Sequence, residues 1–91
     1  MKDYEKADQA VTLLEESGVD IIFAYINEEN TCATGALGKY TDIRRCTVGV
    51  MSRLAIKLKE DGYSPFDCIG ILNQLVLHAV KLAQEAEEEK E

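Results

Sequence analysis

The sequence predicts a small α+β domain whose elements follow the order α-β-β-α-α, with the helices packed on an antiparallel β-hairpin. Three stretches repeat their apolar residues at the spacing of a helix, and two short strand-like runs flank a polar turn. A chain of 91 residues supports one modest core, so we expect a single domain over 1–91. Because two strands alone make a poor sheet, the helices or dimerisation must complete it.

The first helix is expected over residues 3–17. Tyr4, Ala7 and Val11 recur at three- and four-residue spacing, which places them on one face. Gly18 follows this stretch and is a natural helix stop, because glycine adopts the left-handed conformation found after helix ends.

The hairpin is expected over about residues 19–38. Its first strand, 19–27, is rich in β-branched and aromatic residues and is apolar on both faces, so we expect both faces to be covered. After a polar turn the chain returns as a weaker strand over 31–38, in which Gly35 and Gly38 lower the strand propensity.

The second helix is expected over residues 41–60, with Thr41 or Asp42 as its N-terminal cap. Its apolar side chains gather on one face, and most of its basic side chains gather on the opposite face.

The third helix is expected over residues 64–88. Ser64 suits the cap position, Pro65 suits the first helical position, and Asp67 completes a capping box. Most of the circumference of this helix is apolar. The acidic tail, 85–91, is expected to fray, because the helix dipole disfavours acids at a C-terminus.

Charge is unevenly distributed along the chain. The formal net charge is −7, yet the segment from Lys39 to Lys59 holds six basic residues and a single acid. The acidic total argues against general nucleic-acid binding, which draws on many contacts between basic side chains and phosphates. The basic segment can instead attract an anion or another copy of the chain.

The sequence carries no targeting signal or membrane anchor that we can identify. Its N-terminus is charged and lacks the apolar run of a signal peptide. The longest uninterrupted apolar run, from Ile21 to Ile26, has the length of a strand. The three cysteines form neither a disulfide pattern nor a zinc pattern. We therefore expect a cytoplasmic protein with no membrane association.

The sequence offers little for catalysis. Cys32, Cys46 and Cys68 lie on different elements, and free cysteines are most often small buried hydrophobic residues. The single histidine, His78, has no partner of metal-ligand spacing, so we expect no metal, no cofactor and no enzyme activity.

One candidate ligand site lies where the second strand leads into the second helix. The segment is glycine-rich, and backbone N–H groups at a helix start bind anions well. It is not a P-loop, because its glycines are too close together and Tyr40 follows Lys39. The simpler interpretation is a strand exit followed by a helix cap. The candidate ligand-binding residues are Gly38, Lys39, Thr41, Arg44 and Arg45.

A second candidate is an interaction surface. The basic side of the second helix contains a glycine, where a missing side chain would let another backbone approach closely. The third helix and the first strand carry more apolar surface than a 91-residue monomer covers easily, which favours a homodimer. The residues of this candidate surface are Arg45, Gly49, Arg53, Lys57, Leu75 and Leu77.

These features favour a non-enzymatic interaction or regulatory accessory protein, homodimeric and working through a protein partner. Its size and acidity resemble those of small accessory proteins of phages and mobile elements. Two alternatives remain open. The chain could bind a phosphate-bearing or other anionic small ligand at 35–45, or its acidic surface could mimic nucleic acid and inhibit a basic site.

Overall fold

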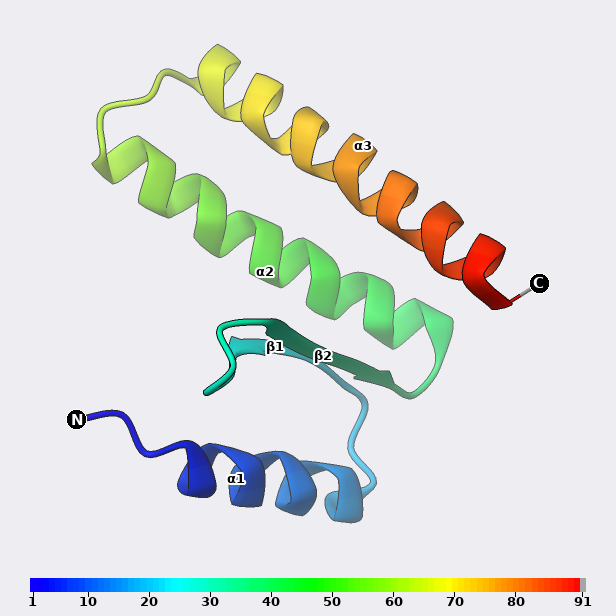
Figure 1. Ribbon diagram of the computed structural model, residues 1–91. Coiled ribbons are helices and arrows are strands. Elements are labelled where there is room, and N and C mark those ends of the chain that lie inside the picture. The colour runs from blue at the N-terminus through cyan, green and yellow to red at the C-terminus, as the bar shows by residue number, and fades with distance from the viewer. Residues whose placement is uncertain (91) are drawn as a thin grey trace. The chain divides into compact units, whose positions relative to one another are not determined.

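A computed structural model describes residues 1–90 and shows the predicted α-β-β-α-α order (Figure 1). The elements are α1 (Tyr4–Ser17), β1 (Ile21–Ile26), β2 (Cys32–Leu37), α2 (Tyr40–Glu60) and α3 (Pro65–Lys90). The mixed α+β class is therefore confirmed. The chain groups into two compact units, Met1–Gly49 and a second that begins at Val50, and each is described by itself. A single domain over 1–91 stays a prediction.

Helix α1 begins and ends as its sequence predicts. The Asp3 side chain caps it by accepting a hydrogen bond of 3.0 Å from the Lys6 backbone N–H. Gly18 closes the helix in the left-handed conformation, with φ of 75°. Both ends of this short helix are thus fixed by local chemistry.

Strands β1 and β2 form an antiparallel hairpin, and Phe23 lies directly opposite Gly35. The turn is closed by Asn27, whose N–H donates to the Thr31 carbonyl oxygen at 2.9 Å. Asn30 adopts a positive φ of 62°, which asparagine tolerates better than most residues. The two strands form a two-stranded sheet, as the predicted hairpin requires.

In the first unit, α1 lies along one side of this hairpin (Figure 1). Its half-buried residues include Ala7 and Val11, and the sheet face of Phe23 and Tyr25 is half-buried as well. The Tyr25 hydroxyl donates to the Asp8 carboxylate at 3.0 Å and links the sheet to the helix. This contact sets which face of the hairpin α1 covers.

The opposite face of β1 is not covered as we expected. Ala24 and Ile26 on that face are exposed, whereas Ile22 is half-buried. The expectation that both faces are covered is therefore wrong for most of the strand. The apolar composition of β1 gave no information about how many helices the unit places against it.

The second unit is a helical hairpin built from the Val50–Glu60 part of α2 and from α3 (Figure 1). Half-buried side chains recur on α2 at Met51, Ala55 and Leu58. The matching partly buried positions near the start of α3 are Ile71 and Leu72. The spacing of these half-buried residues is typical of helices that pack against a neighbour along one stripe of their surface. Beyond Leu72, the side chains of α3 through Glu89 are exposed.

The start of α3 is a capping box, as predicted. The Asp67 N–H donates to Ser64 Oγ at 3.2 Å, and Ser64 Oγ donates to the Asp67 carboxylate at 2.9 Å. The helix continues through Lys90, beyond its predicted end at 88. Glu91, the last residue of the predicted frayed tail, lies outside the described residues.

The predicted caps of α2 are wrong. The helix begins at Tyr40, so Thr41 and Asp42 lie inside its first turn rather than ahead of it. A side chain from the start of β1 takes the capping role, and this contact is described below. Such a cap cannot be predicted from the residues next to the helix, because the residue that provides it lies far away in the sequence.

We predict that Gly35→Ala destabilises the hairpin. A Cβ at this position would collide with the Phe23 ring, which lies over the glycine. Overpacking of this kind costs about 1–3 kcal/mol, measured as a lower free energy of unfolding in urea.

The matched control is Gly70→Ala, within α3, where a Cβ would meet no atom within 4 Å. It should stabilise the protein by up to about 1 kcal/mol, because alanine has the higher helix propensity. Equal stability of Gly35→Ala and the wild type would show that the Phe23 ring can move away without loss.

Candidate functional site

The predicted anion-binding segment leads from β2 into α2 and meets Asp20, just ahead of β1. The Lys39 N–H donates to Asp20 Oδ2 at 3.2 Å. Gly38 adopts a φ of 120°, a conformation that side chains rarely allow, and a Cβ there would collide with the Asp20 carboxyl group. The chain's own carboxylate therefore binds the helix start that was the candidate site for an external anion, which agrees with the simpler interpretation of a helix cap.

Asp20 also faces a second carboxyl group, that of Asp42 in the first turn of α2. Asp42 donates a hydrogen bond to Asp20, and this bond raises the pKa of Asp42 above its ordinary value of 3.8. The same bond, followed by the Lys39 N–H, lowers the pKa of Asp20 below that value. The two carboxyl groups thus favour holding one proton between them.

The basic side chains of the candidate site do not enclose the carboxyl groups of Asp20 and Asp42. Arg45 Nη1 lies 3.8 Å from Asp42 Oδ1, although the guanidinium is mostly exposed. Arg44 and Thr41 are exposed on the same first turns of α2. The structure thus places Gly38 and Lys39 against Asp20 and leaves the two arginines mainly in solvent.

An open depression of about 440 Å³ lies beside this junction. Its lining residues are Asp20, Asp42, Arg45 and Cys46. An incoming phosphate would meet two carboxyl groups and would have to displace Asp20 from the Lys39 N–H. The lining therefore suits an internal helix cap better than an anion-binding site.

Asp20 is the residue that the sequence reasoning missed. The available signal was its position, because it is an acid between Val19 and Ile21 at the start of an apolar strand. A charged residue there needs a partner or solvent. The partner, Lys39, follows nineteen residues later and is brought close by the pairing of Ile21 with Leu37.

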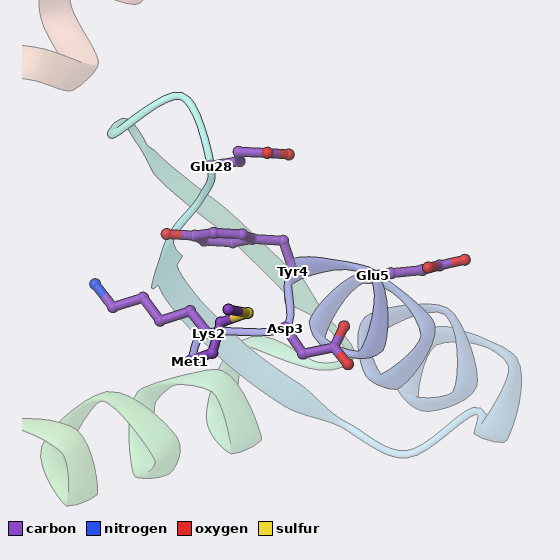
Figure 2. Close-up of a pocket in the computed structure, with 6 residues that line it drawn as sticks. All are labelled: Met1, Lys2, Asp3, Tyr4, Glu5 and Glu28. Atoms are coloured by element: carbon purple, nitrogen blue, oxygen red, sulfur yellow. The ribbon is translucent and has the colours of Figure 1, made fainter.

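A second open depression, of about 380 Å³, lies at the start of α1 (Figure 2). Figure 2 shows the Tyr4 ring in its middle, with Glu28 of the hairpin turn on one side and Met1 and Lys2 on the other. Glu5 points away from the ring. The depression is lined by three carboxylates, one lysine, one tyrosine and one methionine.

No group of three or more histidine, cysteine, aspartate or glutamate side chains within the described part of the chain is placed to hold a metal ion. Cys68 is buried, Cys46 is half-buried and Cys32 is exposed. The expectation of buried cysteines is therefore correct for Cys68 and wrong for Cys32.

The candidate interaction residues of α2 are divided between the two units. Arg45 and Gly49 belong to the first unit, while Arg53 and Lys57 belong to the second, and all four are exposed. A Cβ on Gly49 would meet no atom within 4 Å. The space beside Gly49 is thus open to another molecule.

The largest feature of the surface is apolar. Cys68, at 9% exposure, is the most buried apolar side chain among residues 1–89. The large hydrophobic residues of α3 that remain exposed are Phe66, Ile69, Leu75, Val76, Leu77, Val80 and Leu82. The predicted contacts Leu75 and Leu77 are therefore accessible in the single chain.

The accessible surface of the chain exceeds that of an ordinary monomer. It amounts to 7908 Å² for a chain of 10.1 kDa. Folded monomers of this mass expose about 5300 Å². The difference, about 2600 Å², is surface that small folded proteins normally bury.

Helix α3 also meets the length and composition of a membrane span. Over Pro65–Glu89 its best window has a mean hydropathy of 1.3, and none of that window is buried. The search for a membrane span by uninterrupted apolar runs did not detect this segment, because isolated polar residues interrupt it. Length and composition alone are weak evidence for a span, since the helices of soluble proteins can share them.

Comparison with protein-family models, with curated proteins and with solved structures finds no match to this chain.

We predict opposite pH trends for Asp42→Asn and Asp20→Asn. The raised pKa of Asp42 means that its contribution to stability is present below pH 3.8 and is lost as the pH rises through the raised value. The thermal midpoint of the wild type, measured against Asp42→Asn, should therefore fall as the pH rises above 3.8.

Asp20→Asn provides the opposite control. The lowered pKa of Asp20 means that its contribution is present above pH 3.8 and is lost as the pH falls through the lowered value. The wild type should lose stability relative to this variant on acidification below about pH 4. Parallel midpoints for the wild type and both variants across this range would contradict the shared proton.

Proposed function

We propose that this chain is a non-enzymatic interaction protein that works as a homodimer and serves as a regulatory accessory to a protein partner. The observations that carry the proposal are the excess accessible surface of about 2600 Å² per chain and the large hydrophobic side chains that α3 leaves exposed. Exposed apolar patches of this extent mark interfaces in soluble proteins.

The area suits a stable dimer. A standard protein interface buries about 800 Å² on each partner, and permanent homodimers bury about 2000–5000 Å² in total. The excess surface of one chain is therefore large enough for an interface of the permanent kind. Closed symmetric dimers are also the commonest assembly of soluble chains.

Charge supports self-association through local complementarity. Two copies with a net charge of −7 each repel one another at long range. The basic residues between Lys39 and Lys59 offer each copy a place to meet the acidic residues of the other. An interface that uses this pairing would fix the relative orientation of the copies more than it would add affinity.

A protein partner would then meet what the dimer leaves exposed. The exposed basic side chains of α2 suit an acidic protein surface. The glycine at 49 would let such a surface approach the helix backbone. Such docking would support a regulatory role.

The two alternatives gain less support. Binding of a small anion at residues 35–45 would require the ligand to compete with the Asp20 carboxylate for the Lys39 N–H. Mimicry of nucleic acid rests on the acidic composition alone, and no described geometry favours it.

We predict that light scattering behind size exclusion will give twice the chain mass of 10.1 kDa over a wide concentration range. The thermal midpoint should also rise with protein concentration, because association stabilises the folded chain by mass action. Gln9→Ala on α1 serves as a control, since it changes an exposed neutral residue outside both the apolar and the basic candidate surfaces and should leave the mass unchanged.

A mass of 10.1 kDa at every concentration, with an unchanging midpoint, would contradict the dimer. The apolar surface would then be covered within one chain or by a different protein.

A further inference from the structure

The circumference of α3 divides into three sectors. At about 100° per residue, one sector contains the buried and half-buried residues that face α2, including Cys68 and Leu72. A narrow polar sector contains Gly70, Gln74, His78, Lys81 and Glu85. The third sector, which we call the outer stripe, contains Phe66, Ile69, Asn73, Val76, Leu77 and Val80.

The outer stripe is strongly exposed in the single chain. Phe66 is 86% exposed and Leu77 is 70% exposed. Ile69 is 57% exposed and Val80 is 53% exposed. The stripe spans about 21 Å of helix, which is the length of a four-turn contact between two helices.

The outer stripe is also separate from the contact between α2 and α3. The buried and half-buried residues of α3, Cys68, Ile71 and Leu72, lie on the neighbouring sector. A second helix can therefore pack on the outer stripe without disturbing the helical hairpin of the second unit. Two such hairpins joined this way form a four-helix arrangement, a common way to bury helices of this kind.

We propose that a second copy of this chain occupies the outer stripe, with the two α3 helices antiparallel and centred near Asn73. This inference rests on the proposed homodimer and names its surface. Apart from Val76, which lies opposite Gly70, the pattern of the stripe is self-complementary about Asn73. Phe66 of one copy then lies opposite Val80 of the other, and Ile69 lies opposite Leu77.

The central Asn73 pair fits this arrangement. Its amide is the one polar group among six side chains of the stripe, and it is exposed in the single chain. At the centre of an antiparallel pair the two amides meet and can hydrogen-bond to each other. A lone asparagine within an apolar seam favours one register over others at some cost in stability.

Charge selects the antiparallel direction. The end of α3 carries Glu85, Glu87, Glu88 and Glu89. A parallel pair would place these acids beside their own copies, which is unfavourable. In an antiparallel pair centred at Asn73, these acids extend beyond the N-terminus of the other copy's α3. They then lie toward that copy's Lys57 and Lys59 and toward the positive end of the dipole of its α3.

The outer stripe fits a protein surface better than a lipid bilayer. A helix surrounded by lipid would place Gln74, His78 and Lys81 in hydrocarbon at the middle of the span, where such groups are costly. In a dimer the same polar sector remains in water. Membrane binding is therefore the competing outcome that the experiment must exclude.

The decisive experiment compares Val80→Lys with Gln74→Lys by sedimentation equilibrium. Both variants add one lysine to the exposed part of α3, the first in the outer stripe and the second in the polar sector. We expect Val80→Lys to weaken dimerisation at least about a hundredfold, because it buries an unpaired charge at the interface. Gln74→Lys should leave the dissociation constant within about threefold of the wild type.

Circular dichroism of both variants establishes that each remains folded, and Ile69→Lys provides a second change in the same stripe. A wild-type dimer that persists in both Val80→Lys and Ile69→Lys would overturn the inference and leave the homodimer intact. A wild-type monomer would overturn both proposals. Cosedimentation of that monomer with vesicles of phosphatidylcholine and phosphatidylglycerol would identify the stripe as a membrane surface.

A spin label tests the direction of pairing. The label is placed at Gln84→Cys in a chain carrying Cys32→Ser, Cys46→Ala and Cys68→Ala that still dimerises. An antiparallel pair centred at Asn73 separates the two labels by roughly 30 Å, from a rise of 1.5 Å per residue. A label at Asn73→Cys should instead show the labels roughly 10 Å apart. Short distances at both positions would show parallel pairing and overturn the proposed geometry.

Discussion

The constraint that governs this protein is the amount of apolar surface that 91 residues must keep from water. Three amphipathic helices and a hairpin carry more apolar surface than the chain buries. Among residues 1–89, Cys68 is the only buried hydrophobic residue, and its exposure is 9%. Hydrophobic burial is the main favourable term in folding, so surface left in water is stability not gained. The excess of about 2600 Å² therefore calls for a further surface to cover it, and this requirement underlies both proposals.

Within the first unit, a carboxylate contact joins elements that the sequence keeps apart. Asp20 stands just ahead of β1, and its carboxylate accepts the N–H of Lys39 at the start of α2. Pairing of Ile21 with Leu37 brings these residues together, and the missing side chain of Gly38 leaves room for the carboxyl group. The contact provides α2 with an N-terminal cap, and the shared proton with Asp42 makes this cap sensitive to acidity.

The most exposed apolar surface of the second unit lies on α3. The helix is apolar on two sectors, and α2 occupies one of them near the turn. A helix that is apolar around most of its circumference is stable only when most of that circumference is covered. The depressions of the first unit are open, and carboxylates make up half of the residues that line them.

Sequence alone determined the elements, because each carries its own local signals. Gly18 ends α1 and the Ser64–Asp67 box starts α3, as their positions predict. The candidate site needed the tertiary structure. The sequence selected Gly38 and Lys39 but missed Asp20, because strand pairing and not sequence spacing brings it to them. Coverage of β1 was mispredicted for a related reason, since composition shows that Ala24 and Ile26 are apolar but only packing decides whether a helix lies over them.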